Sequence, residues 1–178
     1  MADRTQLYHS GCLTDGWRLF GAHPATEKGT HGWWFNVWAP RAKAVSVVGD
    51  FNGWDPEETP LAPKGEFWQG FVPDLPVYTS YKYAVTGADG KLRYKADPYG
   101  FHTETRPGTA SKLYDIEHFS WTDEAFRKAK QPVYHQPLNI YEVHLGSWRK
   151  HENGDFLDYR DMARQLAAYV KDMGYTAV

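Results

Sequence analysis

The chain has 178 residues, a length that accommodates one domain or two small ones. A hydrophobic fraction of 42% and an aromatic fraction of 16% are enough to build a packed core, and they exclude the polar, highly charged composition of disordered chains. The net charge is -2 and no stretch concentrates Lys or Arg, so the sequence predicts neither a nucleic-acid-binding nor an anionic-membrane-binding surface.

Targeting segments and metal sites are not expected either. Residues 1–6 carry charges with no apolar run behind them, and no segment approaches the roughly 20 apolar residues of a membrane span, so we predict no signal peptide and no membrane anchor. Cys12 forms no disulfide framework, the histidines lack ligand spacing, and no glycine-rich phosphate loop follows a predicted strand. We therefore expect a cytoplasmic protein without a metal or cofactor.

The first 31 residues give the weakest structural signal. They are rich in Gly, His and Thr, and Leu13, Trp17 and Phe20 have the i, i+4, i+7 spacing of one short helix. We treat 1–31 as a lead segment.

A series of short strands follows, separated by Gly, Pro, Asn and Asp. The predicted strands are 32–40, 44–48, 67–72, 80–86 and 91–95. Tyr81 and Tyr83 alternate with Lys82, and the Asp89-Gly90 pair is a hairpin turn signal between the last two strands. Short strands at intervals of roughly 8–12 residues are typical of an antiparallel β-sandwich, which we place at 32–116.

A linker with one short helix is predicted over 117–138. Thr122-Asp123-Glu124 offers an N-cap with acids in the first turn, and Lys128 and Lys130 complement the other end of a helix at 123–130. Gln131-Pro132 should end it.

From residue 139 the pattern changes to strand, helix, strand. Residues 140–145 form a β-rich run, 158–172 carry an apolar stripe at helical spacing with Gly174 behind it, and a further strand begins at Tyr175. This is a βαβ unit of a parallel sheet. One and a half such units cannot close a core, so we expect 139–178 to be part of a larger domain.

Several runs resemble a known combination of domains. Phe35–Pro40, Val45–Trp54, Tyr81–Tyr83 and Ala96–Tyr99 resemble the starch- and glycogen-binding carbohydrate-binding module of family 48. Asn139–Trp148 resembles the first barrel strand of bacterial branching enzymes, and 159–178 resembles their first barrel helix and second strand. The resemblance implies a mainly β chain: an immunoglobulin-like antiparallel β-sandwich, followed by the first βα unit and second strand of an incomplete TIM (β/α)8 barrel of the glycoside hydrolase 13 type.

The same resemblance implies a function. Branching enzymes transfer a 1,4-linked α-glucan segment through a glycosyl-enzyme and create a 1,6 branch, using two carboxyl groups that retaining chemistry places about 5–5.5 Å apart. In that family both carboxylates lie on later barrel strands, beyond anything that matches 139–178. We therefore assign no catalytic residue and expect this chain alone to be inactive, with glycogen or amylose-like α-glucan as its partner.

Three residues are candidates for carbohydrate binding by this resemblance: Trp54, Lys82 and Tyr94. Trp54 would stack on a glucose ring, or else plug one end of the sandwich; the sequence leaves both open. Lys82 would donate to sugar hydroxyls, although a solvated strand lysine is the commoner case. Tyr94 is the one aromatic residue near the position of a second stacking tryptophan.

The remaining conspicuous residues are expected to have structural roles. Trp34, Trp38, Phe67, Trp68 and Phe71 should serve the core or the contact between module and barrel. Glu142 and His144 share a face of the predicted barrel strand and should be structural or substrate-lining. The incomplete barrel should make the chain self-associate. Alternatives to the branching-enzyme reading are a stand-alone glycan-binding or regulatory module, or a debranching or trehalose-releasing relative.

Overall fold

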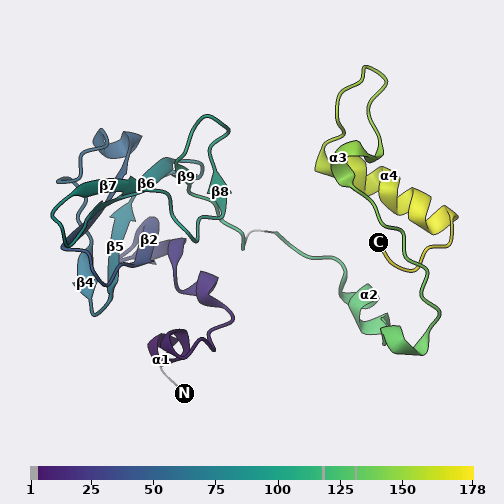
Figure 1. The fold of residues 1–178 in the computed structure, drawn as a ribbon, viewed down its shortest axis with the longest axis horizontal. Coiled ribbons are helices and arrows are strands. Elements are labelled where there is room, and N and C mark those ends of the chain that lie inside the picture. Colours follow the sequence, from purple (N-terminus) through teal and green to yellow (C-terminus); the bar gives the residue numbers. More distant parts are fainter. Residues whose placement is uncertain (1–3, 118, 131) are drawn as a thin grey trace. The chain divides into compact units, whose positions relative to one another are not determined.

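The computed structural model describes residues 4–117, 119–130 and 132–178. The chain divides into two compact units, Met1–Phe119 and Ser120–Val178 (Figure 1). Most regular elements of the first unit are antiparallel strands, whereas those of the second are mainly helices. No helix among the described residues is long and apolar enough to cross a membrane.

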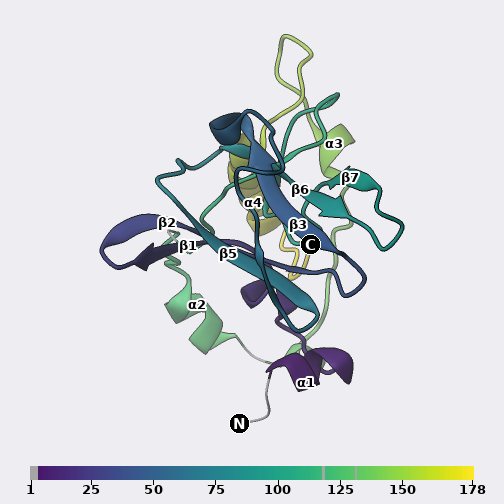
Figure 2. The same ribbon diagram turned by 90° about the vertical axis from the view of Figure 1, so that its left-hand side faces the viewer.

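One sheet of the first unit contains two strands that the sequence analysis did not predict, the first and the last in its order. This sheet has the order β1-β2-β5-β4 and is antiparallel throughout. Its strands are β1 (Gly21–Glu27), β2 (Thr30–Trp38), β5 (Phe67–Pro73) and β4 (Ala62–Lys64). β1 lies in the expected lead segment, yet it pairs with β2 along all seven of its residues (Figure 2). The turn explains this, because Lys28 (φ 49°) and Gly29 (φ 88°) both adopt the positive φ that a tight two-residue hairpin requires.

The second sheet is organised around β6 (Ser80–Thr86). Along one edge β6 pairs with β3 (Ala44–Gly49), and its other neighbours are β7 (Leu92–Lys95) and β9 (Ser111–Lys112). β9 pairs in turn with β8 (His102–Thr103). The hairpin predicted across Asp89-Gly90 is confirmed. β8 and β9 were not predicted, because two-residue strands are too short to show an alternation.

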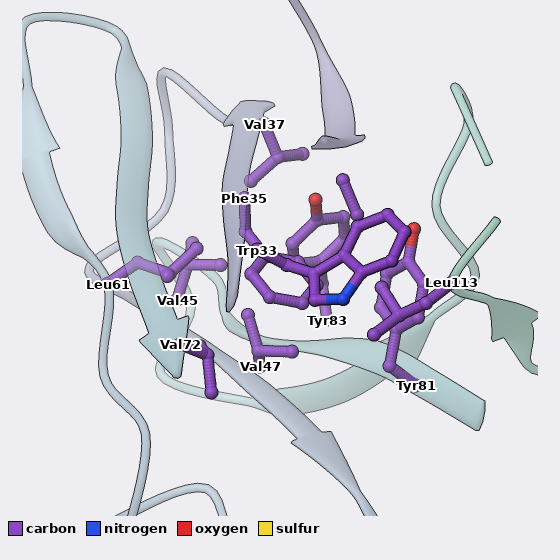
Figure 3. Close-up of a cluster of buried hydrophobic side chains, with 11 residues drawn as sticks. Trp33, Phe35, Val37, Val45, Val47, Leu61, Val72, Tyr81, Tyr83 and Leu113 are labelled. Carbon is purple, nitrogen blue, oxygen red and sulfur yellow. The ribbon is translucent and has the colours of Figure 1, made fainter. Parts of the chain in front are cut away.

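The core lies between the two sheets. Trp33, Phe35 and Val37 of β2 face Val45 and Val47 of β3 and the two tyrosines of β6. Figure 3 shows these side chains pointing toward one another from both sheets, joined by Leu61, Val72 and Leu113. The predicted alternation along β6 is therefore confirmed: Tyr81 and Tyr83 are each 1% exposed.

A buried carboxylate holds the two core tyrosines. The hydroxyl groups of Tyr81 (2.6 Å) and Tyr83 (3.2 Å) both donate to Asp97 Oδ2, and the Tyr99 backbone N–H donates to Asp97 Oδ1 (2.8 Å). The Asp97 N–H itself donates to the Ser111 hydroxyl (2.9 Å). Burial raises the pKa of Asp97 above its ordinary value, although these hydrogen bonds favour the carboxylate and oppose the shift. The network ties β6 to β9 through the chain at 97–99.

An aromatic cluster covers part of the face of the first sheet that points away from the core. The N-terminal segment forms helix α1 (Arg4–His9) and the single 3₁₀ turn η1 (Gly16–Arg18), so the short helix expected between Leu13 and Phe20 is reduced to that turn. Tyr8 of α1 lies edge-on against Phe20 (ring centroids 5.0 Å apart), Trp38 (5.6 Å) and Phe67 (6.2 Å). Among the aromatic residues assigned to core or contact roles, Trp68 packs against the core, while Trp34 and Phe71 meet on this other face.

The second unit contains two of the predicted helices. Helix α2 (Glu124–Ala129) lies within the predicted 123–130 range, and α4 (Tyr159–Asp172) within 158–172. Asp158 caps α4 by accepting from the backbone N–H groups of Arg160 (2.9 Å) and Asp161 (2.8 Å). Gly174 takes the positive φ of 73° that suits the residue after a helix. Gln131, which was expected to help end α2, lies outside the described residues.

The predicted strand at 140–145 is wrong in extent. Ile140 makes one parallel bridge with Ala177, supported by the Tyr141 N–H donating to the Ala177 carbonyl (3.0 Å), and a short helix, α3 (Leu145–Trp148), begins where the strand should end. A parallel strand is stabilised by neighbours on its edges and by helices on its faces. The described residues of 120–178 supply a single parallel bridge, so the β-rich sequence stays extended without forming a ladder.

Candidate carbohydrate-binding site

The outward face of the second sheet carries two of the three predicted site residues. Lys82 lies between the buried Tyr81 and Tyr83, so it projects from the opposite face of the sheet. Tyr94 pairs with Ala84, which is two residues along from Lys82 and therefore on the same face. Tyr94 is 47% exposed, and Leu92 beside it on this face is 44% exposed. The register thus brings Lys82, Leu92 and Tyr94 onto one surface.

Lys82 is held by a loop residue that the sequence analysis missed. Its Nζ donates to the hydroxyl of Thr109 (2.7 Å), an exposed residue between β8 and β9. Glu104 fixes this loop by accepting from the Ala110 N–H (2.8 Å) and the Ser80 hydroxyl (3.3 Å). The Ala110 hydrogen bond is the main reason why the pKa of Glu104 is lowered. Lys82 and Thr109 are far apart in sequence, and no local pattern could have paired them.

Trp54 stands on a tightly bonded loop at the end of β3. The side chain of Asn52 accepts from the Gly49 N–H (3.0 Å) and donates to the Val47 carbonyl and the Thr59 hydroxyl (both 2.9 Å). The backbone N–H of Trp54 donates to the Gly49 carbonyl (2.9 Å), and Trp54 itself adopts a positive φ of 62°. The loop is therefore specified by its own hydrogen bonds.

The orientation of the Trp54 ring is fixed within the same loop. Its Nε1–H donates to Asp50 Oδ1 (2.7 Å), which ties down the edge of the half-buried indole. Phe51 is the residue of this loop that packs against the core. It therefore covers the end of the sandwich, which was the alternative role considered for Trp54. An indole held by its edge can present a ring face to a flat apolar partner.

Strand register brings Lys82 and Tyr94 onto one sheet, and the Trp54 loop begins at the end of a neighbouring strand. β3 ends at Gly49, which pairs with Tyr81, and Val48 pairs with Lys82. The Trp54 loop thus leaves β3 at the end where Lys82 lies, and Tyr94 lies on β7 opposite Ala84, two residues further along β6. Together they offer an aromatic ring, a three-proton donor and a phenol on or beside one surface, which suits a ligand with flat apolar faces and many hydroxyl groups.

The acid and histidine of the second unit are not assembled into a site. Glu142 and His144 were expected to share a strand face, but that strand is absent, and both side chains are exposed. His144 instead precedes α3, where its Nδ1 pairs with the Ser147 hydroxyl (2.8 Å). Across the described residues, no cluster of three or more His, Cys, Asp or Glu side chains could hold a metal ion.

Comparison with known proteins gives this sandwich its class. Residues 19–100 match the profile of carbohydrate-binding module 48 (isoamylase N-terminal domain). Two solved structures share the fold: a putative alpha amylase from Salmonella typhimurium (TM-score 0.61, 19% identity, 88% of this chain and 24% of that one) and the catalytic module of the glycogen-degrading pneumococcal virulence factor SpuA (TM-score 0.63, 20% identity, 90% and 27%). Residues 19–100 are therefore similar in sequence to carbohydrate-binding module 48.

Sequence relatives make the assignment more specific. The chain is 42% identical to the 1,4-alpha-glucan branching enzyme GlgB of Halothermothrix orenii and 45% identical to that of Desulfitobacterium hafniense, in each case over 97% of this chain. It spans about 28% of the length of these relatives. The chain is thus homologous to the N-terminal part of 1,4-alpha-glucan branching enzymes.

Proposed function

We propose that this chain supplies the glycan-binding and scaffolding part of a 1,4-α-glucan branching enzyme that acts on glycogen or amylose-like chains in the cytoplasm. The whole enzyme would cut a 1,4-linked segment by retaining chemistry and transfer it to a glucan 6-hydroxyl. The observation that carries the proposal is the outward face of the second sheet, where Lys82 and Tyr94 lie on one surface and Trp54 stands on a rigid loop beside it.

Each residue has a part in this proposal. Trp54 stacks on a glucose ring, because its indole edge is bonded to Asp50 and its ring does not serve the core cluster. Lys82 donates to sugar hydroxyls, and Thr109 holds its ammonium group in place until a sugar competes for it. Tyr94 and Leu92 extend the surface for a longer chain. An open face of this kind binds weakly, since it encloses little of the ligand.

Affinity electrophoresis in gels containing glycogen tests the site. Trp54→Ala and Lys82→Ala should each abolish most of the retardation, and Tyr94→Ala should reduce it less. Tyr134→Ala, at a residue that is 99% exposed in the second unit, is the matched aromatic control and should migrate as the unsubstituted chain does. Equal retardation of all variants would place the site elsewhere, and no retardation of any would leave the module a purely structural role.

We further propose that residues 139–178 begin the catalytic barrel. The parallel bridge between Ile140 and Ala177, with α4 between them in sequence, supports this because it has the connectivity of a βαβ unit. The chain should then have no branching or hydrolytic activity, as we assign neither carboxylate of the reaction to it. Incubation with amylose, followed by iodine staining and reducing-end assay, tests this; turnover that survives repurification would disprove it.

A further inference from the structure

A hollow on the first unit lies away from the candidate site. It has a volume of about 530 Å³ and is bordered by the loop after β2 and by the β6–β7 hairpin. We call it the hairpin groove; its charged and apolar walls are formed by Trp38, Pro40, Arg41, Asp89, Arg93 and Lys95. The start of β3 and the end of β6 meet here, since Ala44 pairs with Thr86, whereas the Trp54 loop leaves the opposite end of β3.

Strand β7 separates this groove from the candidate site. Arg93 and Lys95 pair with Val85 and Tyr83, whose side chains face inward, so both cations project on the inward side of the sheet. Leu92 and Tyr94 project on the outward side. A ligand in the groove would therefore meet different side chains from a glucan on the outward face.

The groove carries excess positive charge. Asp89 neutralises Arg93 through a two-pronged pair, with distances of 2.7 Å to Nη2 and 3.0 Å to Nη1, and the same bonds hold the pKa of Asp89 well below its usual range. Arg41 and Lys95 have no carboxylate within ion-pairing distance among the described residues. Arg41 lies on the loop after β2 and Lys95 on β7, so the two cations are far apart in the sequence and form no basic run there.

An aromatic wall stands beside these cations. Trp38 is 44% exposed, and Tyr8 packs edge-on against it with ring centroids 5.6 Å apart. Ala39, Ala42 and Val85 complete an apolar floor that packs against the core. The groove therefore combines a partly exposed ring with two uncompensated cations, in a volume within the range of about 300–1,000 Å³ typical of small-ligand pockets.

We propose that the hairpin groove binds a small phosphate monoester attached to a ring. The ring lies against Trp38, and the phosphate accepts hydrogen bonds from Arg41 and Lys95, which are the side chains suited to a phosphate. This site is separate from the proposed glucan site, because Arg93 and Lys95 project on the opposite side of β7 from Leu92 and Tyr94. The same chemistry is found in a hexose phosphate and in a nucleoside monophosphate, and the test separates them.

Calorimetric titration of the full chain distinguishes the ligands. The probes are glucose 6-phosphate, AMP, inorganic phosphate and maltotriose, each at low and at raised salt. One of the two esters should bind more tightly than inorganic phosphate and more tightly than maltotriose, and its binding should weaken as salt rises. Whichever ester binds better identifies the hexose or the nucleoside as the ring.

Variants locate the binding in the groove. Arg41→Gln and Lys95→Gln should each weaken ester binding about tenfold, the effect of losing one charge-assisted hydrogen bond. Both residues are exposed, so the variants should fold. Lys91→Gln is the matched control: Lys91 lies in the same hairpin but outside the groove lining, and its loss should leave the affinity unchanged. Trp54→Ala should also leave ester binding unchanged.

Several results would overturn the proposal. Ester affinity that is unaffected by Arg41→Gln and Lys95→Gln would place the ester elsewhere. Inorganic phosphate binding as tightly as either ester would remove the role of Trp38. Maltotriose binding that depends on Arg41 would make the groove a glucan subsite. Failure of every probe to bind would show that the groove is not a binding site for phosphate esters.

Discussion

The two units of this chain differ in how far their apolar side chains are buried. In the first unit, side chains from two sheets bury one another, and Phe35, Val47 and Leu113 are completely buried. In the described part of the second unit, Leu157 and Met162 are the buried apolar residues, while Ile140, Phe156 and Val178 are each at least 60% exposed. The comparison teaches that a sequence can specify helices and an apolar stripe correctly and still lack the partners that make them a domain.

The largest effect should come from separating the two units. A chain that ends at Phe119 should remain folded and monomeric, because the sandwich core is complete without the rest. The full chain should self-associate as its concentration rises, since Ile140, Phe156 and Val178 remain exposed. Light scattering of both proteins and limited proteolysis of the full chain measure this. A full chain that stays monomeric, with 139–178 protected from protease, would contradict it.

A pair of phenylalanine substitutions sharpens the comparison. Phe35→Ala removes a completely buried ring and should lower the free energy of unfolding by about 3–5 kcal/mol. Phe156→Ala removes a ring that is 65% exposed and should change it by about 0.5 kcal/mol or less. Urea denaturation followed by tryptophan fluorescence compares the two. Similar losses from both would mean that the second unit has a core of its own.

A smaller effect is expected at the buried carboxylate, and it should depend on pH. Tyr81→Phe removes the shorter of the two hydroxyl donors to Asp97 and should lower the free energy of unfolding by about 1.5–3 kcal/mol at pH values above the raised pKa of Asp97, where the acceptor is charged. Below about pH 4 the carboxyl is protonated whether the chain is folded or not, and the loss should shrink to about 0.5–1.5 kcal/mol.

The sign of the native pH dependence follows from the raised pKa of Asp97. The folded chain binds this proton more tightly than the unfolded chain, so the contribution of Asp97 to stability falls as pH rises from about 4 through the raised pKa. Thermal unfolding of Tyr81→Phe across this range measures the change, with Tyr94→Phe, at an exposed hydroxyl, as the control. A cost of Tyr81→Phe that does not vary with pH would show that Asp97 stays protonated in the folded chain.

By itself the sequence determined the elements whose side chains repeat with a clear period. Alternation along 80–86 predicted the buried faces of Tyr81 and Tyr83, the Asp-Gly pair predicted the β6–β7 turn, and the apolar stripe with its cap predicted α4. These signals are local, because each depends on residues within one element or one turn. The order of the strands and the presence of β1 could not be predicted from such local signals. β1 forms because a Lys-Gly turn lets it pair with the long strand β2.

The tertiary structure decided everything that depends on residues far apart in the chain. It placed Lys82 against Thr109, gave the core position in the Trp54 loop to Phe51, and gathered Arg41 and Lys95 around Trp38. It also showed that the β-rich residues 140–145 do not form a strand from their own propensity. The physical reason is the same in each case. Strand pairing, burial and charge clustering depend on contacts between residues that are distant in the sequence, and local sequence patterns do not indicate which of these residues come into contact.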